Sequence, residues 1–370
     1  MIIPFYTANV KHFITFIFQR TGVKIILTRV GFFRIMKKIT SVGTTIRPHC
    51  GSISNKEVTV MYAQKLKRGD EIRVIAPSRS LSIVRQEVCD EAIRFLENEG
   101  FRVTFSKNSR EIDEFNSSSV DSRVSDLHEA FLDDSVKAVL TCIGGFNVNQ
   151  ILDKIDYSII AAHPKILCGY SDITALINAI YAKTGLVTYH GPHFSTFGFE
   201  TNRDYTKNCF LDCAASDNAV TVSPSPQAEK YHVIQHGHCE GQIIGGNLCT
   251  LNLLQGTPYM PDLADKILFI EDDNIMGKYF PYEFDRNLQS LLQLPHADKI
   301  KGIVFGRFDE SWGLSVDVAA KIVKGKISDE IPVLYNVDFG HVTPIMTFPI
   351  GGTAAISADS EHAEITVTEH

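Results

Sequence analysis

A serine stands at a point in this sequence where a buried strand is expected to turn sharply into a helix. The segment Gly169-Tyr170-Ser171-Asp172 follows a short apolar run, and apolar residues at helical spacing then predict a helix from Ile173 to Thr184. On such a turn a serine hydroxyl can project above a sheet, next to backbone amides at the helix start. Serine and aspartate are also favoured helix caps, so this segment alone leaves Ser171 as either a nucleophile or a cap.

A serine nucleophile needs a general base and an acid that orients the base, and the second half of the chain offers one of each. Glu271 ends an otherwise apolar run, where a carboxylate is costly unless it has a partner. His341 follows Gly340 in a loop after a predicted strand. The chain order of serine, glutamate and histidine is that of α/β-hydrolases. Taken singly, Glu271 could equally be a surface acid and His341 an ordinary loop histidine.

Two consecutive glycines, Gly144 and Gly145, follow the apolar run that ends at Cys142. They could cradle a phosphate or a dinucleotide, but the G-x-G-x-x-G spacing and the P-loop lysine are both absent. Two glycines at the end of a strand also let backbone amides approach an oxyanion closely. We therefore predict no nucleotide cofactor.

A second group of residues has the chemistry of metal ligands: His232, His236, His238 and Cys239. Its alternating spacing fits no common zinc pattern and it precedes a predicted strand, so we expect no metal there. The pair Asp272-Asp273 beside Glu271 could bind a cation, but we expect a solvated strand end.

The first half of the chain alternates strands with helices, which predicts βαβ units and a parallel sheet. In such sheets the functional groups gather at the carboxyl ends of the strands. Ser78, Gly144-Gly145, Ser171 and His190 all fall at that edge. The predicted helices and strands of this half are Val84–Gly100, Phe101–Phe105, Ser122–Leu132, Val136–Cys142 and Leu186–His190.

The second half is richer in strands, which predicts a smaller mixed β domain. A Ser-Pro-Ser-Pro stretch at 223–226 resembles an interdomain linker. We therefore expect an N-terminal α/β domain over 61–222, a linker over 223–237 and a C-terminal β-rich domain over 238–370. Strands are expected at Cys239–Ile244, Lys266–Glu271, Gly302–Phe308, Ile331–Tyr335, Ile345–Ile350 and Ala363–Val367.

The composition is that of an ordinary soluble protein, with 44% hydrophobic and 21% charged residues among 370. The net charge of −7 argues against a nucleic-acid partner. The eight cysteines are scattered and form no CxxC pair, so we expect reduced, buried cysteines and a cytoplasmic location.

Residues 1–60 differ from the rest, because they hold nine Lys or Arg and a single acid, Glu57. Basic residues interrupt every apolar stretch, so neither a membrane span nor a signal peptide is expected. We interpret this segment as an extension outside the fold, from a misassigned start, with a targeting segment as the alternative. Met61 opens the first stretch with globular patterning.

Taken together, these segments resemble the LD-carboxypeptidase family of serine peptidases from about Met61 to the C-terminus. Arg123, Asp126, Leu127, Ala130 and Phe131 also fit the N-terminal domain of that family. The segments that carry the resemblance are Gly144-Gly145, Lys165 with Gly169-Tyr170-Ser171-Asp172, His190-Gly191-Pro192, Glu240-Gly241 with Gly245-Gly246-Asn247, Ile270-Glu271-Asp272 and Gly340-His341.

The resemblance implies a flavodoxin-like or Rossmann-like N-terminal domain joined to a smaller β-rich domain. It implies that Ser171 is the nucleophile, with Glu271 and His341 completing a triad across the two domains. The oxyanion hole would use the backbone amides of Gly145 and Asp172. The family also implies a homodimer with no cofactor and no membrane or nucleic-acid partner.

Two substrate classes remain open. Typical members release D-alanine from a murein tetrapeptide, and they often have Arg before the paired glycines. This chain has Ile143-Gly144-Gly145-Phe146-Asn147, which is more similar to the microcin C self-immunity branch, whose substrates join an aminoacyl group to a nucleotide mimic. That branch often has serine after Asn147, where this chain has Val148. A catalytically inactive small-ligand binding protein on the same fold is the alternative to both.

Overall fold

The computed structural model describes residues 59–226, 230–360 and 362–370. The extension expected over 1–60 falls outside the described residues except for residues 59 and 60, and so do 227–229 of the expected linker. From Glu57 to His370 the chain is one compact unit by the density of its contacts. Met61 already belongs to it, since its amide donates to the Gly185 carbonyl over 2.8 Å.

The first sheet has the strand order β12-β5-β4-β3-β1-β2, in which every neighbouring pair except β12 with β5 is parallel. The order 2-1-3-4-5 of its parallel strands is that of flavodoxin-like sheets. Strands β1, β3 and β4 are buried almost throughout, as expected when both faces are covered. The strands are β1 (Glu71–Ile75), β2 (Arg102–Phe105), β3 (Val136–Thr141), β4 (Ile166–Gly169), β5 (Thr188–His190) and β12 (Phe348–Ile350).

Helices connect these strands and bury one apolar face each. In α2 (Gln86–Asn98) the buried residues Val88, Ala92 and Leu96 recur every four positions, which lines one side of a helix. Gly185 ends α5 with a φ of +78°, a left-handed cap that glycine adopts without strain. The other helices of this half are α3 (Val120–Leu132), α4 (Tyr157–Ala162), α5 (Thr174–Thr184) and α6 (Arg203–Ala214).

The second sheet has the order β6-β14-β13-β8-β9-β10-β11-β7. Its centre, from β8 to β11, is parallel, and the outer pairs are antiparallel. Helices α7 (Leu248–Asn252), α8 (Phe280–Leu291) and α9 (Val316–Val323) belong to this half. The strands are β6 (Val220–Val222), β7 (His232–Gln235), β8 (Gly237–Asn247), β9 (Lys266–Glu271), β10 (Gly302–Gly306), β11 (Val333–Val337), β13 (Thr353–Ala358) and β14 (Ala363–Glu369). The predicted fold class, a parallel-sheet α/β half with a β-rich half, is confirmed.

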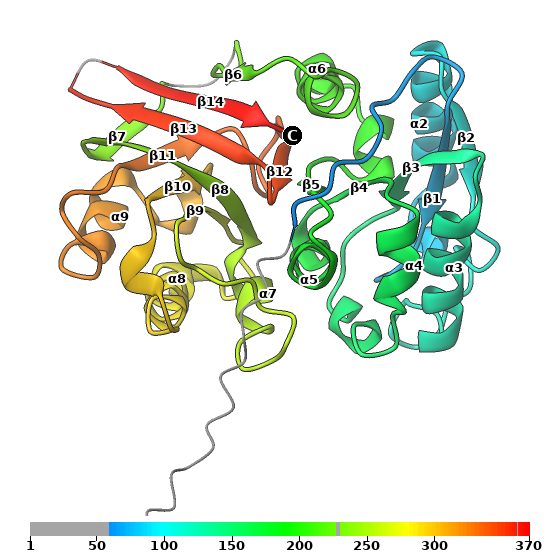
Figure 1. Cartoon of the computed structure of the whole chain (residues 1–370), viewed down its shortest axis with the longest axis horizontal. Coiled ribbons are helices and arrows are strands. Elements are labelled where there is room, and N and C mark those ends of the chain that lie inside the picture. Colours follow the sequence, from blue (N-terminus) through cyan, green and yellow to red (C-terminus); the bar gives the residue numbers. More distant parts are fainter. Residues whose placement is uncertain (1–58, 227–229, 361) are drawn as a thin grey trace, which may run out of the picture. The chain divides into compact units, whose positions relative to one another are not determined.

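The two halves are joined through α5, which lies between the two sheets (Figure 1). Asn178 donates to the Gly245 carbonyl over 2.7 Å, and Thr174 Oγ1 accepts from the Asn247 amide over 3.0 Å. Both contacts tie the helix that follows Ser171 to the end of β8. Strand β12 reinforces the junction, because it comes from the C-terminal part of the chain but pairs with β5 of the first sheet.

Several elements were not predicted. Helix α6 was not predicted, although its buried residues Thr206, Phe210, Cys213 and Ala214 recur at helical spacing, because Phe210 is the only large apolar side chain among them. Strand β7 lies inside the stretch expected to be a linker. The described cysteines are all free, as expected, but Cys249 is exposed rather than buried.

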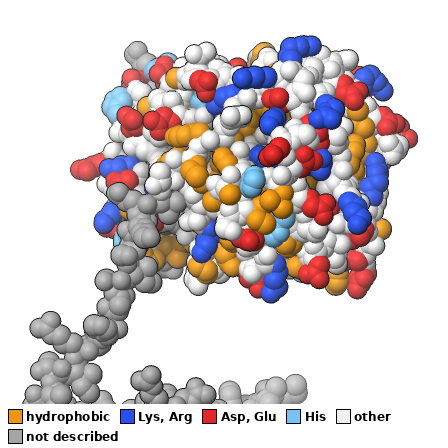
Figure 2. Space-filling model, turned by 45° about the vertical axis from the view of Figure 1, so that its right-hand side comes forward, with side chains coloured by type: hydrophobic (Ala, Val, Ile, Leu, Met, Phe, Trp, Pro, Cys, Tyr) orange, Lys and Arg blue, Asp and Glu red, His pale blue; other side chains and the backbone are white. Residues whose placement is uncertain are grey.

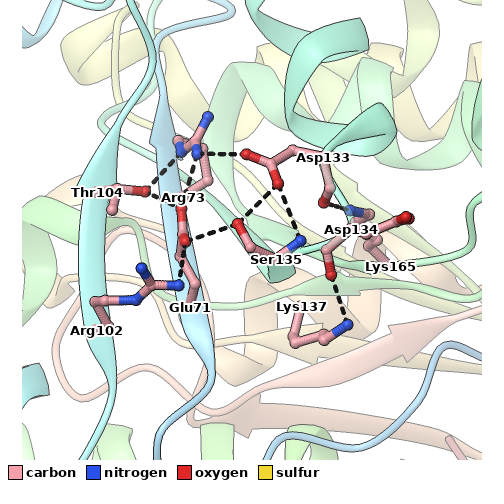
Figure 3. A network of polar contacts seen from close by, with 9 residues as sticks. All are labelled: Glu71, Arg73, Arg102, Thr104, Asp133, Asp134, Ser135, Lys137 and Lys165. Atoms are coloured by element: carbon pink, nitrogen blue, oxygen red, sulfur yellow. Dashed lines mark hydrogen bonds and ion pairs between the residues drawn. The ribbon is translucent and has the colours of Figure 1, made fainter.

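A polar network lies at the amino ends of β1, β3 and β4, the edge opposite to the predicted functional groups (Figure 3). Glu71, only 2% exposed, accepts from Thr104 over 2.5 Å and from Ser135 over 3.0 Å. It also pairs with Arg73 over 2.8 Å and with Arg102 over 2.6 Å. Burial alone would raise the pKa of Glu71, but these donors outweigh it and lower the pKa.

We expect Glu71→Ala to lower the free energy of unfolding by about 2 to 4 kcal/mol, since it removes the acceptor of Thr104 and Ser135 and leaves half-buried Arg73 with Asp133 as its carboxylate partner. The matched variant Arg102→Ala removes a side chain that is 59% exposed and should cost less than about 1 kcal/mol. Urea unfolding of both variants measures the difference. Because the Glu71 pKa is lowered on folding, its contribution is present at neutral pH and is lost as pH falls through the folded-state pKa. Equal effects of the two substitutions would contradict this account.

On the face shown in Figure 2, acidic and basic side chains are interspersed. This face therefore offers no continuous basic strip for a nucleic-acid backbone. Among the helices of the described residues, none combines the length and the apolar character needed to cross a membrane.

Candidate active site

Ser171 lies in a strained turn between β4 and α5. Its φ is +60°, in the left-handed region that residues other than glycine seldom adopt. Gly144 makes room for it, since a Cβ on Gly144 would lie 2.9 Å from the Ser171 Cβ. The helix cap considered for Ser171 is not observed: the N-cap position of α5 is Ile173, without a side-chain cap bond.

The Ser171 hydroxyl instead bonds to a histidine from the other half of the chain. Its Oγ lies 3.0 Å from Nε2 of His341, and Nδ1 of the same ring lies 2.7 Å from Oε2 of Glu271. These three residues come from the ends of β4 and β9 and from the loop after β11. The structure therefore brings together all three side chains that the sequence singled out. In such a chain the histidine can take the serine proton while the carboxylate holds the ring.

Glu271 is fully buried, with an exposed fraction of 0%. Burial alone would raise its pKa, but the charge of His341 and the neighbouring imidazoles outweigh burial and lower the pKa to about 2. The second imidazole is His190, whose Nε2 lies 3.8 Å from Oε1 of Glu271 and which stacks on Phe348. Burial lowers the pKa of His190, although Glu271 acts in the opposite direction, and this favours the neutral form of the ring. The sequence placed His190 at the right edge but gave no sign of this contact.

The pKa of His341 shifts upward, opposite to the shifts of Glu271 and His190. Burial alone would lower its pKa, but the negative charge of Glu271 and the hydrogen bond to it raise the pKa to about 9. Asp273 and Asp272 add to the same effect. This shift favours the imidazolium form of His341 at neutral pH.

The loop that carries His341 is anchored at its start by Asp338. This buried carboxylate pairs with Arg307 and accepts from the Ser225 amide over 2.8 Å. Its own carbonyl accepts from the Met346 amide over 2.6 Å, which closes the loop at the other end. Gly340 then passes close to the acid, because a Cβ there would lie 3.1 Å from the Glu271 Cβ. These contacts fix the distance between His341 and Glu271.

The side chain of Asp172 has a role that the sequence did not reveal. Its Oδ2 accepts from the Ser78 hydroxyl over 2.5 Å and from the amides of Asn147 and Val148 over 2.9 Å each. Asp172 therefore ties the serine turn to the loop that contains Gly145. The sequence prediction concerned only the backbone amides of Gly145 and Asp172. The signal in the sequence for this side-chain role was the presence of a polar residue, Asp172, directly after the serine.

A cavity of about 480 Å³ opens over Ser171 and His341. One wall comes from the first half of the chain and the other from the second. Asp272 and Asp273 are not the solvated strand end that we expected: Asp272 is 2% exposed, and Asp273 lines the cavity. Burial and the charge of Glu271 raise the pKa of both carboxyls. The lining residues are Arg79, Gly145, Phe146, Ser171, Asp273, Asn274, Ile275, Trp312 and His341.

Within the described ranges, no three His, Cys, Asp or Glu side chains are arranged to hold a metal ion. His232 lies in β7, and His238 and Cys239 lie in β8. The His232 ring contacts Tyr335.

Comparisons with known proteins agree with this architecture. Family models match the LD-carboxypeptidase N-terminal domain over residues 72–191 and its C-terminal domain over 240–356. A putative carboxypeptidase of Bacillus subtilis, YocD, is 50% identical over 84% of this chain and 100% of its own length. A probable murein peptide carboxypeptidase of the same organism is 36% identical over 81% of this chain and 92% of its own.

Two solved structures are similar to this chain in both fold and sequence. An MccF-like protein from Bacillus anthracis has a TM-score of 0.82 and 49% identity, and the match covers 84% of this chain and 100% of that one. The microcin C7 self-immunity protein MccF in complex with aspartyl sulfamoyl adenosine has a TM-score of 0.74 and 28% identity, with 84% and 99% covered. The chain belongs to the LD-carboxypeptidase family and is an enzyme of the carboxypeptidase class.

Proposed function

We propose that this protein is a serine carboxypeptidase that hydrolyses the C-terminal amide bond of a small peptide or peptide-like substrate. The observation that carries the proposal is the hydrogen-bonded chain from Ser171 through His341 to Glu271 at the floor of a cavity. The strained backbone of Ser171 supports it, because such strain is typical of a nucleophile elbow.

In the proposed reaction, His341 removes the proton of Ser171, whose oxygen attacks the carbonyl carbon of the substrate. Glu271 holds the imidazole and stabilises its charged form. The backbone amides of Gly145 and Asp172 bind the oxyanion, and the Asp172 side chain keeps the Gly145 loop beside the serine. His341 then protonates the leaving amine, and water hydrolyses the acyl-enzyme.

The reaction should depend on pH through His341. Since a general base must be neutral to act and the His341 pKa is raised to about 9, kcat/KM should climb about tenfold per pH unit below that value and level off above it. Steady-state rates between pH 6 and pH 10 measure this limb. A plateau that begins at pH 7 would contradict the proposed environment of His341.

The substrate is proposed from the relatives. Murein peptides are the substrates of one relative by its name, and a sulfamoyl adenosine conjugate is bound by another in a solved structure. Exposed aromatic and aliphatic side chains at the cavity, Phe146 at 70% and Ile275 at 64%, could contact a planar base as in the second class. We therefore keep both classes, a murein tetrapeptide and an aminoacyl-nucleotide-like conjugate.

Mass-spectrometric turnover on both substrates in parallel tests the proposal. Release of D-alanine from the tetrapeptide would indicate cell-wall peptide hydrolysis, and cleavage of aspartyl sulfamoyl adenosine alone would indicate an immunity-type peptidase. The alternative, an inactive binding protein on this fold, predicts no turnover and no labelling of Ser171 by a serine-directed fluorophosphonate. Labelling of wild-type protein but not of a Ser171→Ala variant would exclude it.

On the family resemblance we further propose a homodimer without nucleic-acid or membrane partners. From the scattered cysteines we propose a cytoplasmic location, and from the pattern of helices and strands a division into domains at 61–222 and 238–370 with a linker at 223–237. Sedimentation at several concentrations tests the homodimer.

A further inference from the structure

The two walls of the cavity carry opposite charges, and neither charge is neutralised by an ion pair between described residues. Arg79 lies on the wall with Gly145 and Phe146, and Asp273 lies on the wall with Asn274 and Ile275. No carboxylate of the described chain is paired with Arg79, and no lysine or arginine is paired with Asp273. The charge of His341 acts on Asp273, but no ion pair of the described residues engages Asp273 or Arg79, so each can bind a charged group of a ligand.

Asp273 is held in place rather than mobile. Asn247, at the end of β8, donates to Asp273 Oδ2 over 3.3 Å and to Asp272 Oδ1 over 3.1 Å. The Asp273 amide closes the same turn by donating to Asp272 Oδ1 over 3.0 Å. Burial raises the pKa of Asp273, the positive charge of His341 lowers it and the charge of Glu271 raises it, so that the net shift is upward.

Arg79 is also fixed in place. Its Nε donates to the Gly144 carbonyl over 3.1 Å, and its guanidinium lies over the Phe146 ring at 5.8 Å. Within the described residues no hydrogen bond uses its two terminal amino groups, which can therefore bind a ligand. A guanidinium presented in this way suits a carboxylate or another oxyanion, which it can bind through two parallel hydrogen bonds.

We propose that the cavity takes substrates that carry both an ammonium group and an anionic group, with Asp273 binding the ammonium and Arg79 binding the anion. This rests on the proposed function, since the same cavity holds Ser171 and His341. Both substrate sources meet the requirement: a peptide with a free amine and a C-terminal carboxylate, or an aminoacyl conjugate with a free amine and a sulfamate. Asp273 and Arg79 would then set specificity rather than take part in bond cleavage.

The test measures binding to Ser171→Ala protein, so that no turnover is required. Calorimetric titrations use two pairs of probes: the murein tetrapeptide with free or acetylated amines, and aspartyl sulfamoyl adenosine with a free or acetylated amine. Free-amine probes should bind better than their acetylated forms. Adding Asp273→Asn should weaken the free-amine probes about 10- to 100-fold and the acetylated forms less than threefold. If only one of the two pairs of probes showed the preference for a free amine, that pair would identify the substrate class.

The second arm examines Arg79. Arg79→Gln should weaken the tetrapeptide about tenfold or more, and should leave its C-terminal amide almost unchanged. The ratio of acid to amide is the readout, because Arg79 also bonds to Gly144 and its loss could shift that loop. The control is Asp90→Asn, which repeats the substitution made at Asp273 at an exposed position of α2. It should alter neither the ratio of free to acetylated probes nor the ratio of acid to amide.

The proposal would be wrong if Asp273→Asn weakened free and acetylated probes alike, since Asp273 would then act only on the shape of the loop. It would also be wrong if no free-amine probe bound better than its acetylated form. Failure of the proposed chemistry is a separate result, because absent turnover and absent fluorophosphonate labelling of wild-type protein leave the binding ratios unaffected.

Discussion

Replacing Ser171 by alanine should lower kcat/KM by at least about 10⁴-fold, on either substrate class, while the protein stays folded. The Oγ lost in this variant is the atom 3.0 Å from His341 Nε2, and none of the other described residues that line the cavity carries a hydroxyl. The remaining rate would come from binding and from the backbone amides near Gly145 alone. Initial rates on the cleaved substrate, together with a thermal unfolding curve, measure the effect.

Ser158→Ala is the matched control, since Ser158 is an exposed serine at the start of α4. It should leave kcat/KM unchanged. A folded Ser171→Ala protein that retained more than about a tenth of the wild-type rate would remove Ser171 from the proposed reaction.

Replacing Glu271 by glutamine should lower kcat/KM by about 10⁴-fold at neutral pH, although the volume of the side chain is kept. A neutral amide cannot stabilise an imidazolium, and it can place the wrong tautomer of His341 toward Ser171. The negative charge of Glu271 is also a cause of the raised His341 pKa. The lower limb of the pH profile should therefore move from about 9 toward the ordinary histidine value.

The shift of the pH profile separates this role from a merely structural one. If Glu271 only filled buried space, the glutamine variant would retain the wild-type profile and lose stability alone. Glu97→Gln, at an exposed position of α2, should change neither the rate nor the profile. A Glu271→Gln protein within tenfold of wild type would contradict the proposal.

The strand-to-helix alternation that the sequence showed was enough to predict the first sheet and the edge at which its functional groups lie. Largely apolar sequences such as those of β3 and β4 are typical of strands buried on both faces, and this is how parallel sheets are covered. Less regular segments escaped prediction. Strand β13, Thr353–Ala358, consists mainly of alanine, threonine and serine, and only its pairing with β8 and β14 makes it a strand.

The functional site, like the fold, could be predicted only in part. Ser171, Glu271 and His341 could be singled out one by one, because each stands where a buried strand ends and because their segments match a family. Their contact could not be derived from spacing, since 170 positions separate Ser171 from His341. The contact between Ser171 and His341 depends on α5 and β12. These elements join the two halves of the chain, through Asn178 with Gly245 and through the pairing with β5.

What the sequence by itself determined is the family and the class of fold, because these depend on local pattern and on residue type; for the same reason it could single out the three side chains as candidates. The tertiary structure alone decided what surrounds them. It placed His190 beside Glu271, made the Asp172 carboxylate an anchor for the Gly145 loop, and buried Asp272 where a solvated strand end was expected. These are contacts between residues far apart in the chain, and burial and charge at such points arise only when the two sheets pack together.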